Sequence, residues 1–286
     1  MKHATESTVA LVSVVLSTLL ANGALAQKDI SGHWTQTNSE QRYSDTGIGN
    51  YSGLPVNEAA RIRADTWSPE RLFMPIHQCE PHPAPYTPVG PAGLRIQAVI
   101  DRRTQETIAW RMAAHWMENE RTVWMDGREH PPEWAQHTWN GFSTGEWNGD
   151  MLSVTTTHLK QAWIRRNGAP QSDRAVLREH WVVNDDVLTL VTVLQDPVYL
   201  TEPLIRSMTW VRNPGYLIGS YTCHITAEVL YPRGYVPFNL PGQNTMLMDN
   251  EPARWGMPQE VIRGGARTLL PEYAEELKTY LQERGQ

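Results

Sequence analysis

Three ionisable side chains fall on otherwise apolar faces of expected β-strands. Successive side chains of a strand point to opposite faces, so residues two positions apart share a face. The three are His158 in the strand 151–158, Glu179 in the strand 177–183 and Arg206 in the strand 204–212. Burying a lone charge is costly, so these groups are expected to find one another, other polar groups or water.

A shared cavity would let these three side chains carry out acid/base chemistry. His158 would be the general acid or base, because the pKa of an imidazole already lies near neutrality. Glu179 would orient it or share its proton, and Arg206 would hold an oxyanion or carboxylate. The alternative is a structural ion pair that fixes strand register, with His158 a satisfied core histidine. As a set, the three indicate a candidate site.

Further residues are candidates for holding a ligand. The chain has twelve tryptophans but only three phenylalanines, and an indole is either core filling or a flat platform for rings, sugars or isoprenoids. Polar candidates come from two loops between the expected strands. The ligand-binding candidates are Trp110, Trp181, Trp210, Tyr199, Arg165 and Arg166. The competing interpretation is that the tryptophans fill the core and the loops are ordinary turns.

The two cysteines, Cys79 and Cys223, predict a disulfide if the chain is exported. The bond would close a loop of 223 − 79 = 144 residues and clip an N-terminal loop to a late strand. The alternative is a zinc or copper site in which His77, His82 and His224 join the thiolates. That set lacks the paired ligand spacing of a zinc finger, so no metal is expected.

Strand periodicity predicts a mainly β fold. Apolar alternation recurs in at least eight segments between 94 and 229, and Asn148-Gly149 marks a tight hairpin. Strands paired in sequence order form an antiparallel meander, which hides its edges best by closing into a barrel. Gly32-His33-Trp34 resembles the first strand of lipocalin-like barrels, in which the Trp plugs the floor. Short helices are expected from Asn57 to Asp65 and after Ser68, and a C-terminal helix from Pro271 to about Arg284.

The N-terminus predicts export. Residues 1–26 carry an apolar run too short to span a bilayer and end in Ala24-Leu25-Ala26, which is typical of a cleaved signal peptide; an uncleaved anchor is the alternative. The remaining 286 − 26 = 260 residues are expected to form one domain, 27–286, free of the membrane in the periplasm or outside the cell. Loop-rich extensions are expected at 40–92 and 232–286, and the C-terminal helix is expected to pack on the outside of the sheet.

Composition and missing motifs exclude several functions. A net charge of −6 without a cluster of Lys and Arg argues against nucleic acid as a partner. The chain has no Gly-x-Ser-x-Gly, no phosphate-binding Gly loop, no Gly-x-Gly-x-x-Gly and no His-Glu-x-x-His, so no cofactor is expected.

The segment from Met125 to Trp210 resembles a group of uncharacterised exported bacterial proteins rich in β-structure. The matching motifs are Asp126-Gly127-Arg128-x-His130-Pro131, Thr138-Trp139-x-Gly141-x-Ser143-x-Gly145-x-Trp147-x-Gly149-Asp150, Thr156-Thr157-His158-Leu159-Lys160 and Asp196-Pro197-Val198-Tyr199-Leu200-Thr201-Glu202-Pro203. The resemblance implies no activity. Many such relatives have Asp-Thr where this chain has Thr156-Thr157-His158, which makes His158 the mark of a subgroup.

The sequence therefore predicts a periplasmic β-barrel enzyme that acts on a small, partly apolar molecule, such as an aromatic or terpenoid, by metal-free lyase, isomerase or hydrolase chemistry. A carrier or binding protein of the same fold without chemistry is the first alternative, and a metal-binding periplasmic protein is the second. The partner in the first two cases is a small-molecule ligand.

Overall fold

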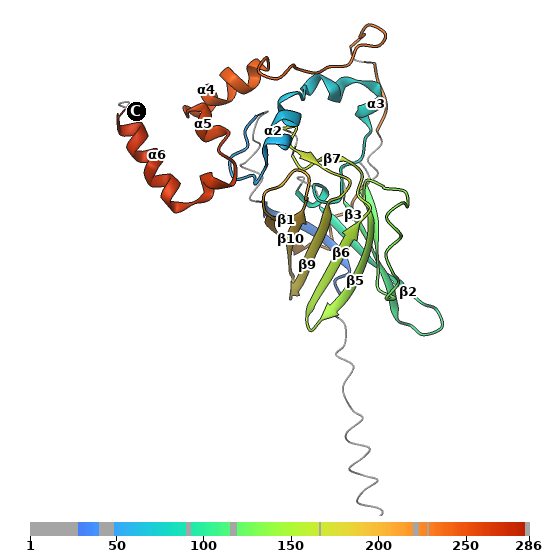
Figure 1. Cartoon of the computed structure of the whole chain (residues 1–286). Helices are drawn as coiled ribbons and strands as arrows, with labels where there is room; N and C mark the ends of the chain where they lie inside the picture. The colour runs from blue at the N-terminus through green and yellow to red at the C-terminus, as the bar shows by residue number, and fades with distance from the viewer. Residues whose placement is uncertain are drawn as a thin grey trace, which may run out of the picture.

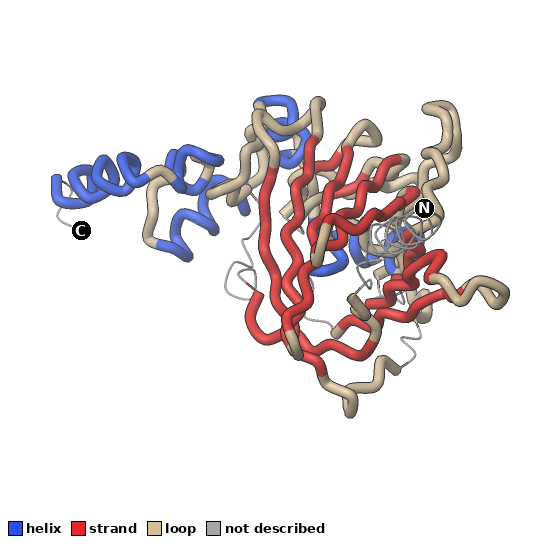
Figure 2. The backbone as a smooth tube through the Cα atoms, turned by 90° about the horizontal axis from the view of Figure 1, so that it is seen from below, coloured by secondary structure: helices blue, strands red, loops and turns tan. Residues whose placement is uncertain are grey.

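Alternation of buried and exposed side chains shapes the strands into a closed barrel. The computed structural model describes residues 28–39, 49–89, 93–114, 119–165, 167–219, 223–227 and 229–283. Along β9 and β10 every second residue is buried, so each strand turns one apolar face inward. The strands curve around a common interior (Figures 1 and 2). The predicted signal peptide, 1–26, lies outside the described residues.

The predicted mainly β barrel is confirmed, and it has nine strands in the order β1-β11-β10-β9-β6-β5-β4-β3-β2. Their bounds are β1 Gly32–Ser39, β2 Leu94–Ile100, β3 Thr107–Ala114, β4 Asn119–Trp124, β5 Phe142–Asn148, β6 Met151–Thr157, β9 Val176–Asn184, β10 Val187–Gln195 and β11 Leu204–Arg212. One pair departs from a pure meander: β4 and β5 run parallel, because the long connection 125–141 brings the chain back to the same end.

Two short strands, β7 (Ala162–Trp163) and β8 (Pro170–Gln171), pair with each other outside the barrel. They lie at the same end as the N-terminal helices (Figure 1). The helices and helical turns are α2 Glu58–Asp65, η2 Pro69–Phe73, α3 Pro75–Gln78, η3 Thr87–Val89, η5 Met246–Asn250, α4 Glu251–Trp255, α5 Gln259–Ile262, η6 Gly265–Leu269 and α6 Pro271–Glu283. The predicted caps are present, since Asn57 accepts from the backbone N–H of Ala60 and Ser68 from that of Glu70.

Trp34 belongs to the buried core of the barrel. Its indole is fully buried, donates to the Ile30 carbonyl at 3.2 Å and lies beneath the Arg212 guanidinium, 4.3 Å from the ring centroid. Gly32 has a φ of +134°, and a Cβ there would lie 2.8 Å from an Arg212 nitrogen. Glycine is therefore required both by backbone conformation and by the close approach of Arg212.

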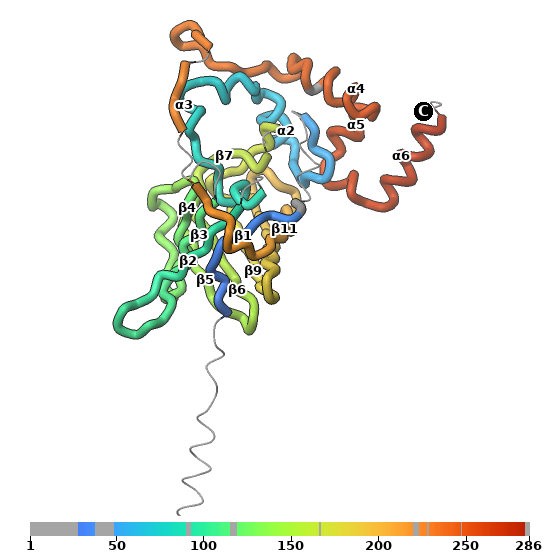
Figure 3. The backbone as a smooth tube through the Cα atoms, turned by 180° about the vertical axis from the view of Figure 1, so that it is seen from behind, coloured from blue at the N-terminus to red at the C-terminus, as the bar shows by residue number. Residues whose placement is uncertain are grey.

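Two predictions about the C-terminal part are wrong. Cys223–Ala227, expected to belong to a late strand, is coil. The predicted helix is present as α6, but it does not pack on the sheet: it extends away from the barrel, none of its residues is buried and its main contact is η6 (Figures 1 and 3). The stripe of Tyr273, Leu277 and Leu281 is partly covered, whereas most of the helix is exposed.

The predicted disulfide is confirmed: Cys79 and Cys223 are bonded. Beside it, the Gln78 amide exchanges two hydrogen bonds with the backbone of Thr226 at 2.6 and 2.7 Å. We call residues 223–244 the C-terminal arm. Because the bond removes both thiols, the alternative metal set loses its sulfur ligands, and among the described residues no group of three or more His, Cys, Asp or Glu side chains could hold an ion.

Reducing this disulfide is expected to free the arm without unfolding the barrel. Both cysteines lie outside the barrel strands, so the opening is local. In limited proteolysis without denaturant, trypsin should cut after Arg233 several-fold faster once the bond is reduced, while the barrel stays folded. The unfolding midpoint should fall on reduction, because the bond closes a 144-residue loop that contains most of the barrel strands. A barrel that unfolds together with the reduction would contradict this expectation.

Candidate functional site

Glu179 and Arg206 point into the barrel, as alternation predicts. Glu179 is fully buried and Arg206 is 7% exposed. Both stand opposite Thr192, Glu179 across β9–β10 and Arg206 across β10–β11. The two charged side chains therefore share one cross-strand row with a threonine between them, and they form no ion pair with each other.

The partner of Glu179 is Arg121, from β4 on another wall. An Nη2 atom of Arg121 donates to Oε1 of Glu179 at 2.7 Å, and the two side chains are 9% and 0% exposed. The same guanidinium lies 3.8 Å from the Met112 sulfur. A charge-assisted hydrogen bond in a low-dielectric interior offsets much of the cost of burying these two groups.

Arg206 has no such partner. Its two Nη atoms each lie 3.4 Å from the carbonyl of Ile164, and no carboxylate of the described residues pairs with it. Burial, and after it the nearby positive charge of Arg165, lower the pKa of the Arg206 guanidinium to about 9. The pKa of Arg165 is also lowered by burial. The positive charge of Arg165 thus adds to the cost of burying the Arg206 guanidinium.

His158 does not join Glu179 and Arg206, so the prediction of one shared cavity is wrong. It is the first residue beyond β6 and has a φ of +57°, which breaks the alternation that placed it on the inner face. Its Nε2 bonds the Pro132 carbonyl at 3.0 Å and its Nδ1 bonds the Thr157 hydroxyl at 2.7 Å. Thr157 belongs to the outward face of β6, so His158 lies on the outer wall.

His158 is part of a directional hydrogen-bond chain that sequence reasoning missed. A carbonyl only accepts, so Nε2 of neutral His158 carries the hydrogen and its Nδ1 accepts from Thr157. Thr157 Oγ1 then accepts from Nδ1 of His130 at 2.7 Å, and Nε2 of His130 is hydrogen-bonded to the Thr144 hydroxyl at 2.8 Å. The chain ties the connection 125–141 to β5 and β6.

The burial of His130 within this chain predicts a pH dependence. Burial, and then the charge of His158, lower the pKa of His130 in the folded state. The unfolded chain, with an imidazole pKa of about 6.5, therefore binds a proton at pH values at which His130 of the folded chain does not. The free energy of unfolding is expected to be unaffected above about pH 6.5 and to decrease as the pH falls below that value. Urea unfolding at pH 7.5 and 5.5 measures how much unfolding free energy each protein loses between the two pH values. The loss should be smaller in His130→Gln than in the wild type, and the same as the wild type in His180→Gln. Equal losses in all three proteins would contradict the expectation.

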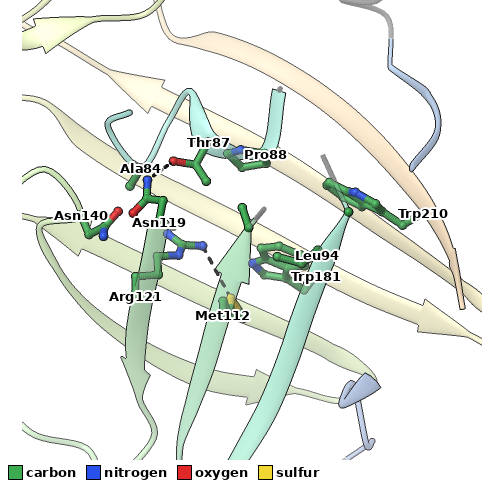
Figure 4. Close-up of a pocket in the computed structure, with 12 residues that line it drawn as sticks. Ala84, Thr87, Pro88, Leu94, Met112, Asn119, Arg121, Asn140, Trp181 and Trp210 are labelled. Carbon is green, nitrogen blue, oxygen red and sulfur yellow. Dashed lines mark hydrogen bonds between the residues drawn. The ribbon is translucent and has the colours of Figure 1, made fainter. Parts of the chain in front are cut away.

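A small cavity of about 30 Å³ lies inside the barrel beneath the segment Ala84–Val89 (Figure 4). Trp181 and Trp210 stack at a ring distance of 6.1 Å and line it with Arg121. Asn119 holds the segment above, donating to the His82 carbonyl at 2.6 Å and to the Thr87 hydroxyl. The volume has room for about two water molecules, so a larger ligand requires Ala84–Val89 to move.

Several buried polar atoms of the barrel interior have no hydrogen-bond partner among the described residues. Most are N–H donors. They are Nη1 of Arg121, Nε of Arg206, Nε1 of Trp110, Trp181 and Trp210, and the acceptors Oε2 of Glu179 and Oδ1 of Asn119. Buried polar groups are normally satisfied, so an excess of donors favours a guest whose atoms accept hydrogen bonds.

The other predicted ligand residues are dispersed. Trp110 is 2% exposed in the barrel core and does not line the cavity. Tyr199 lies outside the barrel interior, where its hydroxyl accepts from the Gln161 amide at 3.2 Å. Arg166 lies outside the described residues. Asp196, at the corner before Tyr199, is buried and accepts from both the backbone and the hydroxyl of Ser172 at 2.7 Å, which indicates a structural turn.

Sequence reasoning missed Arg121 and Asn119. The signal was present, because both alternate with Val123, a buried residue of the same strand. It was overlooked because the strand is short and begins beside a segment without clear periodicity.

Comparison with models of known protein families and with curated proteins finds no match to this chain. In the described part of the chain, no helix combines the length and apolar character needed to cross a bilayer.

Proposed function

We propose that the protein binds a small, partly apolar molecule with a carboxylate or similar acidic group inside the barrel, and that it does so outside the cytoplasm as a binding or carrier protein. The observation that carries the proposal is the surplus of buried N–H groups in the barrel interior that have no partner among the described residues, including Nε of Arg206, a side chain that pairs with no described carboxylate. A carboxylate supplies only acceptors and the missing negative charge. The disulfide is in keeping with an oxidising compartment.

The stacked pair Trp181 and Trp210 supports the apolar part of this ligand description. Their ring planes are 20° apart and both line the cavity, together with Leu94 and Met112. Flat and flexible apolar side chains of this kind accommodate rings and short alkyl chains. Chemistry on the ligand is not favoured, because the acid/base histidine of the catalytic hypothesis lies on the outer wall.

Matched pairs of ligands test the proposal by calorimetry on the disulfide-bonded protein. Benzoate and hexanoate should bind saturably, and benzyl alcohol and hexanol at least about tenfold more weakly, the value expected for losing a charge-assisted hydrogen bond. Equal affinity for acids and alcohols, or no binding of either acid, would contradict the proposal. His158→Gln should leave binding unchanged, and mass spectrometry should find no product after hours of incubation; a product lost in His158→Gln would favour the enzyme instead.

A further inference from the structure

A second, larger hollow lies outside the barrel, and we call it the indole cleft. Its volume is about 220 Å³, against about 30 Å³ for the barrel cavity. It opens between the segment 63–80, which contains the end of α2, η2 and α3, and the pair β7–β8, with Trp139 completing the wall. These elements lie together beyond one end of the barrel (Figure 1). The cleft takes in none of the residues that line the barrel cavity.

Three tryptophans, Trp67, Trp139 and Trp163, line the cleft. Trp163 is held edge-on by the rings of His82 and Tyr86, each 5.3 Å away. Trp139 lies 5.1 Å from the Lys160 ammonium. Neighbouring groups thus fix the indole planes before any ligand arrives, which lowers the entropic cost of binding.

The position of Trp67 depends on Gly168, whose backbone packs against it. Gly168 has a φ of +87°, and a Cβ there would lie 2.7 Å from the Cβ of Trp67. The indole therefore packs directly against the backbone of the loop between β7 and β8.

The charges of the cleft are predominantly positive, although the whole chain carries −6. Arg63 and Arg71 line it and form no ion pair with any described residue. The acidic group among its lining residues, Glu80, accepts from Nδ1 of His77 at 3.0 Å. The cleft thus offers two guanidinium groups to an anion and a carboxylate oxygen to a hydrogen-bond donor.

The C-terminal arm fixes the outer wall of the cleft. Apart from the disulfide at Cys79, the Asn239 backbone N–H donates to the Thr66 carbonyl at 2.9 Å and its side-chain amide to the Trp67 carbonyl at 3.1 Å. Asn244 adds a bond to the Asp65 carbonyl at 3.2 Å. The disulfide and these hydrogen bonds thus hold the segment that bears Arg63, Trp67 and Arg71.

We propose that the indole cleft binds an acidic saccharide through a single hexuronate ring. The ring faces lie against Trp139 and Trp163, and the sugar carboxylate is held by Arg63 and Arg71. The ring hydroxyls donate to Glu80 and bond the Gln161 amide. This site is separate from the carboxylate site proposed inside the barrel and does not depend on it.

A sugar acid fits the cleft better than an aromatic acid does. Polar atoms make up most of the cleft surface, so a ligand must bring hydrogen-bonding groups around its whole edge. Glu80, whose Oε2 already accepts from His77, can accept from a sugar hydroxyl through its other oxygen, whereas an aromatic carboxylate without hydroxyl groups would place carbon or another negative charge there.

Saturation-transfer NMR on the full disulfide-bonded chain tests the proposal with methyl β-D-glucuronide, the neutral methyl β-D-glucoside and benzoate. The glucuronide should bind about tenfold more tightly than the glucoside, as expected for the gain of a charge-assisted bond. Arg71→Gln should abolish that difference while leaving glucoside binding unchanged, and Trp139→Ala should weaken both sugars. A merely structural role of Arg71 would reduce both sugars equally.

Two controls separate this site from the barrel. Arg206→Met should leave glucuronide binding unchanged, and benzoate should not compete with the glucuronide. The proposal is overturned if the wild type does not prefer the glucuronide to the glucoside, or if Arg206→Met removes glucuronide binding while Arg71→Gln does not. The wild-type comparison stands even if a variant fails to fold.

Discussion

Replacing Arg206 with methionine is expected to make the unliganded protein more stable and to abolish its preference for acids over alcohols. Arg206 is 7% exposed, and its guanidinium bonds the Ile164 carbonyl, pairs with no described carboxylate and lies near the positive charge of Arg165. Methionine is flexible, apolar and of similar volume, and it needs no counter-charge. Removing an uncompensated buried cation is expected to raise the free energy of unfolding by about 1–3 kcal/mol.

Urea unfolding of both proteins, with and without saturating benzoate, measures the two halves of this prediction. Benzoate should stabilise the wild type and leave Arg206→Met unaffected, because a ligand stabilises only the state that binds it. Arg206→Lys keeps the charge and should remain less stable than the methionine variant, while Arg102→Met, at an exposed turn, should change little. A large loss of stability in Arg206→Met would contradict the prediction.

Replacing Glu179 is expected to lower the free energy of unfolding, the opposite of the effect expected for replacing Arg206. Glu179→Leu leaves Arg121 buried without its carboxylate, and breaking a buried ion pair from one side costs about 3–5 kcal/mol. The two arginines face the same interior, yet one is compensated by the protein and the other is not. Their contrasting response follows from the position of a single carboxylate.

The double variant Arg121→Met with Glu179→Leu isolates the charge effect from packing. It is expected to recover most of the loss, to within about 1 kcal/mol of the wild type, since both partners become apolar together. The measurement is a double-mutant cycle of unfolding free energies. If the double variant is as unstable as Glu179→Leu alone, lost packing rather than an unpaired charge would explain the effect.

Alternation along single strands could be predicted from the sequence. It correctly placed Glu179 and Arg206 on buried faces, because the side-chain period of a strand is two whatever the partner strands are. Local chemistry likewise gave the hairpin at Gly149, which has a φ of +62°, and the cap at Asn57. The export signal and the resemblance to an exported family stay predictions.

The composition of the candidate site could not be predicted, because it depends on which strands meet across the closed barrel. Arg121 reaches Glu179 from a strand 58 positions earlier, and no local pattern encodes that approach. One residue beyond β6, the positive φ of His158 turned its imidazole to the outer wall, and a local periodicity argument has no means of seeing such a break.

Short-range periodicity and the pairing of two cysteines were enough to predict most barrel strands, the disulfide and the buried faces of Glu179 and Arg206. The folded arrangement was needed to show that Glu179 has a charged partner while Arg206 pairs with no described carboxylate, and that three tryptophans line a cleft beside the C-terminal arm. The physical reason is that burial follows from the repeat of one strand, whereas charge compensation depends on distances between segments that only closure of the barrel brings together.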